Sequence, residues 1–239
     1  MPRPPRKVVA DGCYHALNRG NGRMKLFHKP ADFLAFLNVL REGVARYPVD
    51  VLCYCLMSNH WHLVLRPRTP RALADLMRWV GVTHVRRHHQ HYHSRGGGHL
   101  YQGRFKSFPI QDDRHFLTVC RYVEANPLRA KLVDRAQDWD YSSLRWWPGI
   151  GRVVQSVGDD GPPVPLAAWP VDRPRDWRAR VNEPPADKEL DALRTSVNRG
   201  RPFGEPDWVA KTARRLDLGN TLRPPGRPRK AEQGQSRDR

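Results

Sequence analysis

Two histidines, His60 and His62, are separated by a single tryptophan and have the spacing of a metal-binding pair. Side chains alternate between the faces of a β-strand, so a strand here would project both imidazoles one way and Trp61 and Leu63 into the core. Two imidazoles rooted about 6–7 Å apart can bind one divalent ion. Exposed surface histidines show the same pattern, which by itself leaves both interpretations open.

A second group of residues that could take part in catalysis lies at 122–127. Tyr122 and Asn126 are four residues apart and would share one face of a helix. Pro127 disfavours helical geometry at the residue before it, so the helix should end at Asn126. The amide oxygen there could complete a His-His-Asn metal site, with the phenol one turn away. Taken alone, the motif is better explained by a core tyrosine and a capping asparagine.

Together the two motifs supply what phosphodiester cleavage needs, which is a nucleophile and a cation on the phosphate oxygens. A phenol with a pKa of about 10 attacks poorly at neutral pH unless its developing charge is stabilised. A neighbouring metal ion would help to stabilise that charge. Attack by Tyr122 would give a 5′-phosphotyrosine link and a free 3′-hydroxyl, which allows resealing without water.

The charge of the chain favours a nucleic-acid partner. Its 42 Lys and Arg against 24 Asp and Glu give a net charge of +18, and such a surplus is most often matched by nucleic acid. An anionic membrane is the weaker alternative, because the chain has neither a run of 18 apolar residues nor a basic stretch with a full apolar face. The basic N-terminus lacks the apolar segment of a signal peptide, and we expect a cytoplasmic protein.

The elements expected around the motifs indicate an α+β fold. Ser58 and Asn59 should form a two-residue hairpin turn, and Asp112 or Asp113 can cap a helix. The order strand, helix, strand, strand, helix, strand, helix predicts a ferredoxin-like antiparallel sheet with helices packed on one face. The strands are expected at residues 13–18, 49–57, 60–65 and 105–111, and the helices at 30–47, from 70 to about 85, and from 113 towards 127.

Three segments in this order resemble the REP-associated tyrosine transposases, relatives of the single-tyrosine HUH transposases of bacterial insertion sequences. They are residues 57–65, 101–107 and 121–130, and residues 139–143 also fit, so that the resemblance covers residues 8–147.

The resemblance implies an HUH endonuclease fold that acts on single-stranded palindromic elements folded into hairpins. It also implies that His60 and His62 are metal ligands, that Asn126 is the third ligand, that Tyr122 is the nucleophile, and that the ion is Mg²⁺ or Mn²⁺. The chain departs from the family pattern in having Trp61 and a long C-terminal extension.

Three regions are expected along the chain: a catalytic domain at 1–147, a Pro/Gly-rich linker or irregular extension at 148–189, and a basic DNA-contacting region with a disordered tail at 190–239. Partial AT-hook matches occur at 200–202 and 226–228, although a basic disordered tail explains them equally well. A helix around residues 208–218 could dock on the catalytic domain or on a hairpin stem. The residues expected to contact DNA are Arg19, Arg23, Arg104, Lys106, Arg201, Arg227, Arg229 and Lys230.

The remaining metal-binding residue types have simpler interpretations. The four cysteines lack CxxC spacing, which favours buried free thiols. A zinc site in which Cys55 faces His62 across the hairpin is the alternative. The histidines at positions 84–99 could bind a transition metal, but a loop at 88–98 and a solvated surface that faces DNA is the preferred interpretation.

The sequence therefore predicts a site-specific single-stranded DNA endonuclease and strand transferase. A relaxase or replication initiator with the same chemistry is one alternative. A DNA-binding regulator that keeps the fold without cleavage is the other. The oligomeric state, monomer or homodimer, is left open.

Overall fold

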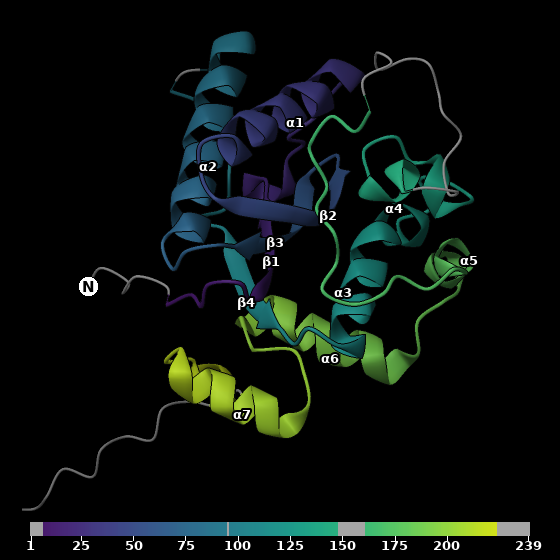
Figure 1. Ribbon diagram of the computed structural model, residues 1–239. Coiled ribbons are helices and arrows are strands. Elements are labelled where there is room, and N and C mark those ends of the chain that lie inside the picture. Colours follow the sequence, from purple (N-terminus) through teal and green to yellow (C-terminus); the bar gives the residue numbers. More distant parts are fainter. Residues whose placement is uncertain (1–6, 95, 148–160, 224–239) are drawn as a thin grey trace, which may run out of the picture.

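A four-stranded antiparallel sheet forms the centre of the protein, for which the computed structural model describes residues 7–94, 96–147 and 161–223 (Figure 1). Its strands β1 (Cys13–Arg19), β2 (Val49–Met57), β3 (His60–Pro67) and β4 (Lys106–Ile110) lie in the order β2-β3-β1-β4. Helix α1 (Pro30–Val44) connects β1 to β2, and α2 (Ala72–His91) connects β3 to β4. This connectivity confirms the predicted ferredoxin-like fold.

The hairpin that carries the two histidines has the predicted two-residue turn. Met57 pairs with His60 and Cys55 with His62. The register fixes the face to which each side chain points, since a slip by one residue would exchange the two faces. Trp61 and Leu63 accordingly belong to the core beneath α1 and α2.

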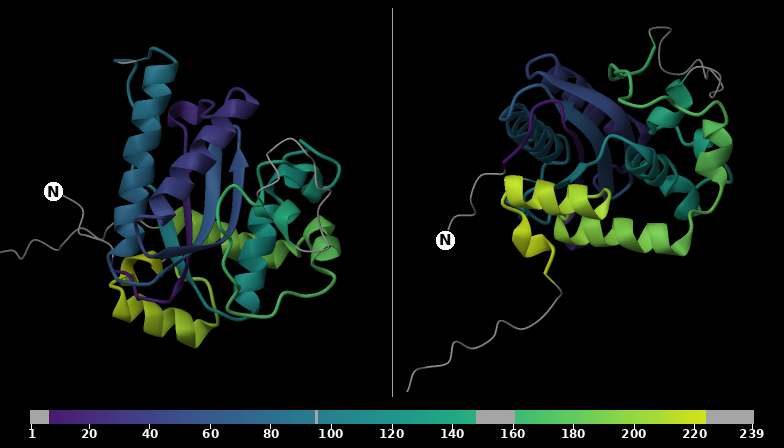
Figure 2. Two further views of the ribbon diagram at one scale, coloured as in Figure 1. Left: turned by 45° about the horizontal axis from the view of Figure 1, so that its top comes forward. Right: turned by 60° about the horizontal axis from the view of Figure 1, so that its bottom comes forward.

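Helices cover both faces of the sheet, not one as predicted. Helices α1 and α2 pack on the face that contains Trp61 and Leu63, and α3 (Arg114–Glu124) packs on the opposite face against Cys53 and Val64 (Figures 1 and 2). The physical reason is that the central strands are apolar on both sides: residues 51–57 of β2 are all buried. A strand buried on both faces needs a covering layer on each.

Helix α3 is capped as predicted and ends close to the predicted position. The Asp113 carboxylate accepts a hydrogen bond from the backbone N–H of His115 at 2.8 Å, as an N-cap residue does. The helix ends at Glu124, and a short helix α4 (Asn126–Arg129) follows, with Pro127 in its first turn. The 3₁₀ turns η1 (Asn21–Arg23), η2 (Ala136–Asp138) and η3 (Ser143–Trp146) complete this part of the chain.

The C-terminal extension packs on the sheet domain. Helix α6 (Asp187–Arg199) lies along α3 and β4 (Figure 2), and the backbone of Phe203 bonds to that of Pro109 and Gln111 at the edge of the sheet. Ala167 bonds to Val51 at the other edge. The extension, which also contains α5 (Trp177–Asn182), α7 (Pro206–Arg215) and η4 (Gly219–Thr221), thus covers both edge strands, which would otherwise expose unpaired backbone groups.

A buried carboxylate, Glu124, joins α3 to this extension. Its two oxygens accept hydrogen bonds from the Ser143 hydroxyl at 2.6 Å and from the indole N–H groups of Trp147 and Trp177 at 2.9 and 2.8 Å. Burial raises the pKa of the Glu124 carboxyl. Three donors satisfy a group that would be costly to bury alone.

The prediction for the cysteines is confirmed, and the prediction for the histidines at positions 84–99 is wrong in part. All four cysteines are buried and free, and the described residues contain no group of three or more His, Cys, Asp or Glu side chains that could hold a metal. Helix α2, however, extends to His91, so the loop predicted at residue 88 begins later. His84 and His88 are buried, not solvated, because α1 and Phe27 pack over this part of α2.

Across the described part of the chain, none of the helices combines the length and the apolar character needed to cross a membrane.

Candidate active site

The candidate site lies on the face of the sheet that α3 covers. His60 pairs with Arg19, and His62 pairs with Leu17, which in turn pairs with Lys106. Directly paired residues project to the same face of a sheet. The register therefore sets two of the predicted DNA contacts, Arg19 and Lys106, on the same face as the two histidines.

Each histidine of the pair is held through one ring nitrogen. Nδ1 of His60 is 2.6 Å from the side-chain oxygen of Asn59, and Nδ1 of His62 is 2.9 Å from Nε2 of His15. The two rings are nearly perpendicular, with centroids 5.0 Å apart. Both histidines are thus left with Nε2 as the nitrogen that could bind a ligand.

The surroundings of the pair keep both imidazoles neutral. Burial, together with the positive charges of Arg19 and Arg129, lowers the pKa of His60 to about 4. Burial and the same charges lower the pKa of His62 well below its ordinary value. A histidine binds a metal ion through a neutral ring, so these two residues fit the role that the sequence predicts for them.

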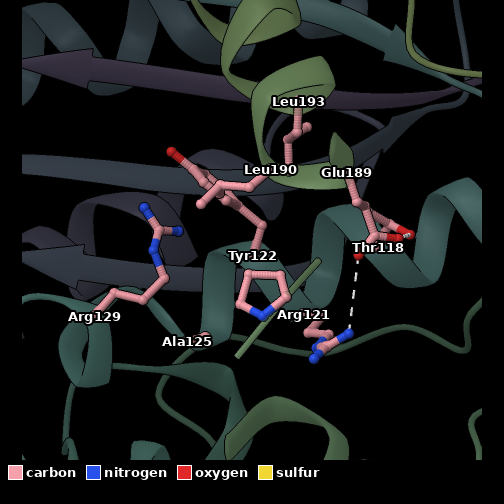
Figure 3. A pocket seen from close by; sticks show the side chains of 9 residues that line it. Thr118, Arg121, Tyr122, Ala125, Arg129, Glu189, Leu190 and Leu193 are labelled. Atoms are coloured by element: carbon pink, nitrogen blue, oxygen red, sulfur yellow. Dashed lines mark hydrogen bonds and ion pairs between the residues drawn. The ribbon is translucent and has the colours of Figure 1, made fainter. Parts of the chain in front are cut away.

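Tyr122 lies next to the histidines. Its ring centroid is 5.8 Å from that of His62 and 6.4 Å from that of His15. The Arg129 guanidinium stacks on the phenol ring, 4.3 Å from its centroid. Figure 3 shows Tyr122 between this arginine and Leu190 of α6, in a hollow that they line together. The structure therefore brings the predicted nucleophile and one predicted ligand into direct proximity.

Asn126 sits one helical turn beyond Tyr122 and is buried. Its side-chain NH₂ group donates to the backbone carbonyls of Tyr122 and Val123 at 3.0 and 3.2 Å. These bonds fix the amide and leave its oxygen as the atom with coordinating ability. Its role as a third ligand remains a prediction.

Two neighbours of the site were not singled out from the sequence. Arg129 is close to Tyr122 and has a buried Nη1 that lacks a hydrogen-bond partner in the described part of the chain. His15 is fully buried and bonded to His62. The available signal was weak in both cases: Arg129 is two helical turns after Tyr122, and His15 is a polar residue within an apolar strand.

The other predicted DNA contacts are distributed more widely. Arg23 is exposed, and its carbonyl oxygen accepts a hydrogen bond from Asn59, the residue before His60. Arg104 is exposed before β4. Arg201 lines a separate hollow with Arg114, between α3 and the C-terminal helices. Arg227, Arg229 and Lys230, with the second AT-hook match, lie outside the described residues.

The comparisons with known proteins bear on the family of the part of the chain that contains this site. A family model described as "Transposase IS200 like" matches residues 8–126, and this part of the chain, which contains all four proposed site residues, belongs to that family. The resemblance to REP-associated tyrosine transposases is confirmed.

A curated relative from Haemophilus influenzae, described as a "Putative REP-associated tyrosine transposase", is 24% identical over 120 residues. The match spans 46% of this chain and 66% of that relative. A solved structure of a REP-associated tyrosine transposase bound to a REP hairpin is 17% identical, with a TM-score of 0.48, and covers 60% of this chain and 83% of its own.

Proposed function

We propose that the chain is a site-specific single-stranded DNA endonuclease and strand transferase with Tyr122 as its nucleophile. The observation that carries the proposal is the position of Tyr122 beside His62, 5.8 Å between ring centroids. This pair lies on a sheet face that also presents Arg19 and Lys106. A nucleophile, neutral imidazoles and cationic side chains in one place are the components of phosphodiester cleavage.

In the proposed reaction the phenolic oxygen of Tyr122 attacks phosphorus. The new bond joins the Tyr122 oxygen to the 5′-phosphate, and the bond from phosphorus to the 3′-oxygen breaks. The phenol releases its proton to solvent, and the leaving 3′-oxygen takes up a proton from solvent to become a hydroxyl. The Arg129 guanidinium stacks on the ring and holds the phenol in place beside His62. Arg19 and Lys106 orient the DNA backbone.

His60, His62 and Asn126 would hold the divalent cation, Mg²⁺ or Mn²⁺. A bound cation supplies charge neutralisation on the phosphate oxygens. The Nδ1 atom of each histidine is engaged by a neighbour, and burial lowers the pKa of both rings, which favours the neutral form that a cation requires.

The proposed partner is single-stranded DNA that folds into a hairpin. The positive net charge of +18 supports a nucleic-acid partner, and a structurally similar protein was solved with a REP hairpin. We also propose that the protein is located in the cytoplasm, because its proposed DNA substrate is there. A relaxase-like nicking enzyme and a DNA-binding regulator without cleavage remain the alternatives.

The test is to incubate the full-length chain with end-labelled, palindromic single-stranded DNA and Mg²⁺ or Mn²⁺, followed by denaturing electrophoresis. A protein–DNA adduct that survives denaturant is expected, and Tyr122→Phe should abolish it. Tyr101→Phe is the matched control, since Tyr101 also contacts a histidine but lies in the core.

The alternatives predict different outcomes. Efficient cutting of duplex DNA by Tyr122→Phe would indicate a hydrolytic nuclease. Binding without an adduct under either ion would favour the regulator. Nicking of a replication or transfer origin in preference to palindromic repeats would favour the relaxase-like enzyme.

A further inference from the structure

The buried histidine His15 lies beside the site and has no part in the reaction proposed above. It is on β1, with its side chain on the α3 face of the sheet next to Phe108 and Tyr122. Its Nε2 is 2.9 Å from Nδ1 of His62, and the two ring planes differ by only 9°. Both residues are buried, at 0% and 3% exposure, so a single N–H···N hydrogen bond joins them away from solvent.

The proton in this bond can belong to either ring, and the choice decides what His62 can bind. A neutral imidazole carries one N–H. If His15 donates from Nε2, the proton of His62 is on its own Nε2, and that nitrogen cannot bind a cation. If His62 donates from Nδ1, its Nε2 keeps a lone pair.

Burial of His15 does not decide between the two arrangements. Nδ1 of His15 has no hydrogen-bond partner within the described residues, so it is an unsatisfied donor in one arrangement and an unsatisfied acceptor in the other. The surroundings of His62 do distinguish them. Arg19 is paired with His60 and projects to the same sheet face as His62, and Arg129 stacks on Tyr122, which lies against His62. Both positive charges act on His62. Such charges favour a lone pair on Nε2 of His62 over an N–H dipole.

We propose that His15 is a positioning residue whose Nε2 accepts a hydrogen bond from Nδ1–H of His62, and so keeps Nε2 of His62 free for a divalent cation. The inference rests on the proposed function in assigning a cation to His62. Metal-binding histidines commonly donate their other N–H to a carboxylate or a carbonyl. Here an imidazole takes the place of that acceptor.

The position of the proton can be measured without metal or DNA. A long-range ¹H–¹⁵N correlation spectrum of the full-length, metal-free chain at about neutral pH distinguishes the two tautomers. The His62 signals, assigned by their loss in His62→Gln, should show the proton on Nδ1. A proton on Nε2 would overturn the proposal. This measurement uses the unchanged chain, so it does not depend on the folding of a variant at position 15.

A second measurement tests the consequence for the cation. The Mn²⁺ affinity, measured by calorimetry, should fall about 10- to 100-fold in His15→Phe, which keeps a ring and loses the acceptor. His15→Gln, whose side-chain oxygen can still accept, should restore most of the affinity. His84→Phe is the control for the loss of a buried, hydrogen-bonded histidine elsewhere and should bind as the unchanged chain does. Unaltered Mn²⁺ affinity in folded His15→Phe would contradict the proposal.

These results separate the two proposals. A Nδ1–H tautomer of His62 in a chain that forms no DNA adduct would support the role of His15 and reject the proposed function. An adduct formed by a chain with the Nε2–H tautomer would support the function and reject the role of His15.

Discussion

Two tyrosines of this protein each contact a buried histidine, on opposite faces of the same sheet, and only one is suited to chemistry. The hydroxyl of Tyr101 accepts a hydrogen bond from the Trp61 indole at 3.0 Å and bonds to Nδ1 of His84 at 2.8 Å. Burial raises the pKa of Tyr101. Tyr122 is partly exposed and lies against His62 and Arg129. Within residues 7–94, 96–147 and 161–223, no hydrogen bond engages its hydroxyl.

The difference shows that proximity of a tyrosine to a histidine is not enough to define a site. A phenol whose oxygen is fully engaged in the core contributes to packing. A phenol whose ring is held by an arginine and whose oxygen is not engaged in a hydrogen bond can react with a substrate. Helix α3 shows the same contrast over two residues, because Glu124 is satisfied by three donors while Tyr122 faces the site.

Loss of the DNA adduct should distinguish most strongly between the buried histidines of the two sheet faces. His62→Ala should reduce the DNA adduct to background, since it removes a proposed ligand beside the nucleophile. His84→Ala removes an equally buried histidine from the other face and should leave the adduct yield per folded molecule near that of the unchanged chain. The check is quantitative denaturing electrophoresis with Mn²⁺. Equal losses in both variants would show that the effect comes from folding alone.

The next effect concerns stability. Glu124→Gln replaces one acceptor oxygen with an NH₂ group that faces donors, and the free energy of unfolding should fall by about 3 kcal/mol. Urea denaturation followed by tryptophan fluorescence measures this, and Glu189→Gln is a partly exposed control that contacts α3. A loss no greater than that of the control would mean that Glu124 does not tie α3 to the C-terminal extension.

Tyr101→Phe should lower the free energy of unfolding by about 1 to 3 kcal/mol, because the Trp61 indole and His84 lose a shared partner in the core. The same variant should still form the DNA adduct. Denaturation and electrophoresis on one preparation give both results. A variant with unchanged stability and no adduct would reverse the roles assigned to the two tyrosines.

The effect that is smallest for a change of one pH unit is a dependence of stability on pH. Burial lowers the pKa of His84 to about 3, whereas an unfolded histidine has a pKa of about 6.5. Between these values the unfolded chain binds a proton that the folded chain does not. The free energy of unfolding should therefore fall as the pH falls from about 6.5, by at most about 1.4 kcal/mol per pH unit for this residue. His84→Phe should show a shallower slope, and an identical slope would contradict the assignment.

The sequence was sufficient for the parts of the site that depend on local geometry. The two-residue turn sets the Cys55–His62 register, and strand alternation separates His62 from Trp61. The cap at Asp113 also followed from neighbouring residues. These features are decided within a few residues of the chain, where turn and capping rules apply.

The features that could not be predicted depend on distant contacts. The partners of Glu124 are 19, 23 and 53 residues away. Both faces of β2 are apolar, so its sequence does not say which helix covers which face. His84 and His88 are polar residues in a helix whose burial is imposed by α1, and the local pattern indicated a solvated surface instead.

The phenolic oxygen of Tyr122 is proposed to form the covalent bond to DNA. Mass spectrometry of a protease digest of the purified adduct tests it most directly. We predict a nucleotide 5′-phosphate attached to the peptide that contains Tyr122, with fragmentation placing it on that residue. Attachment to Tyr101, to another side chain or to no residue would contradict it.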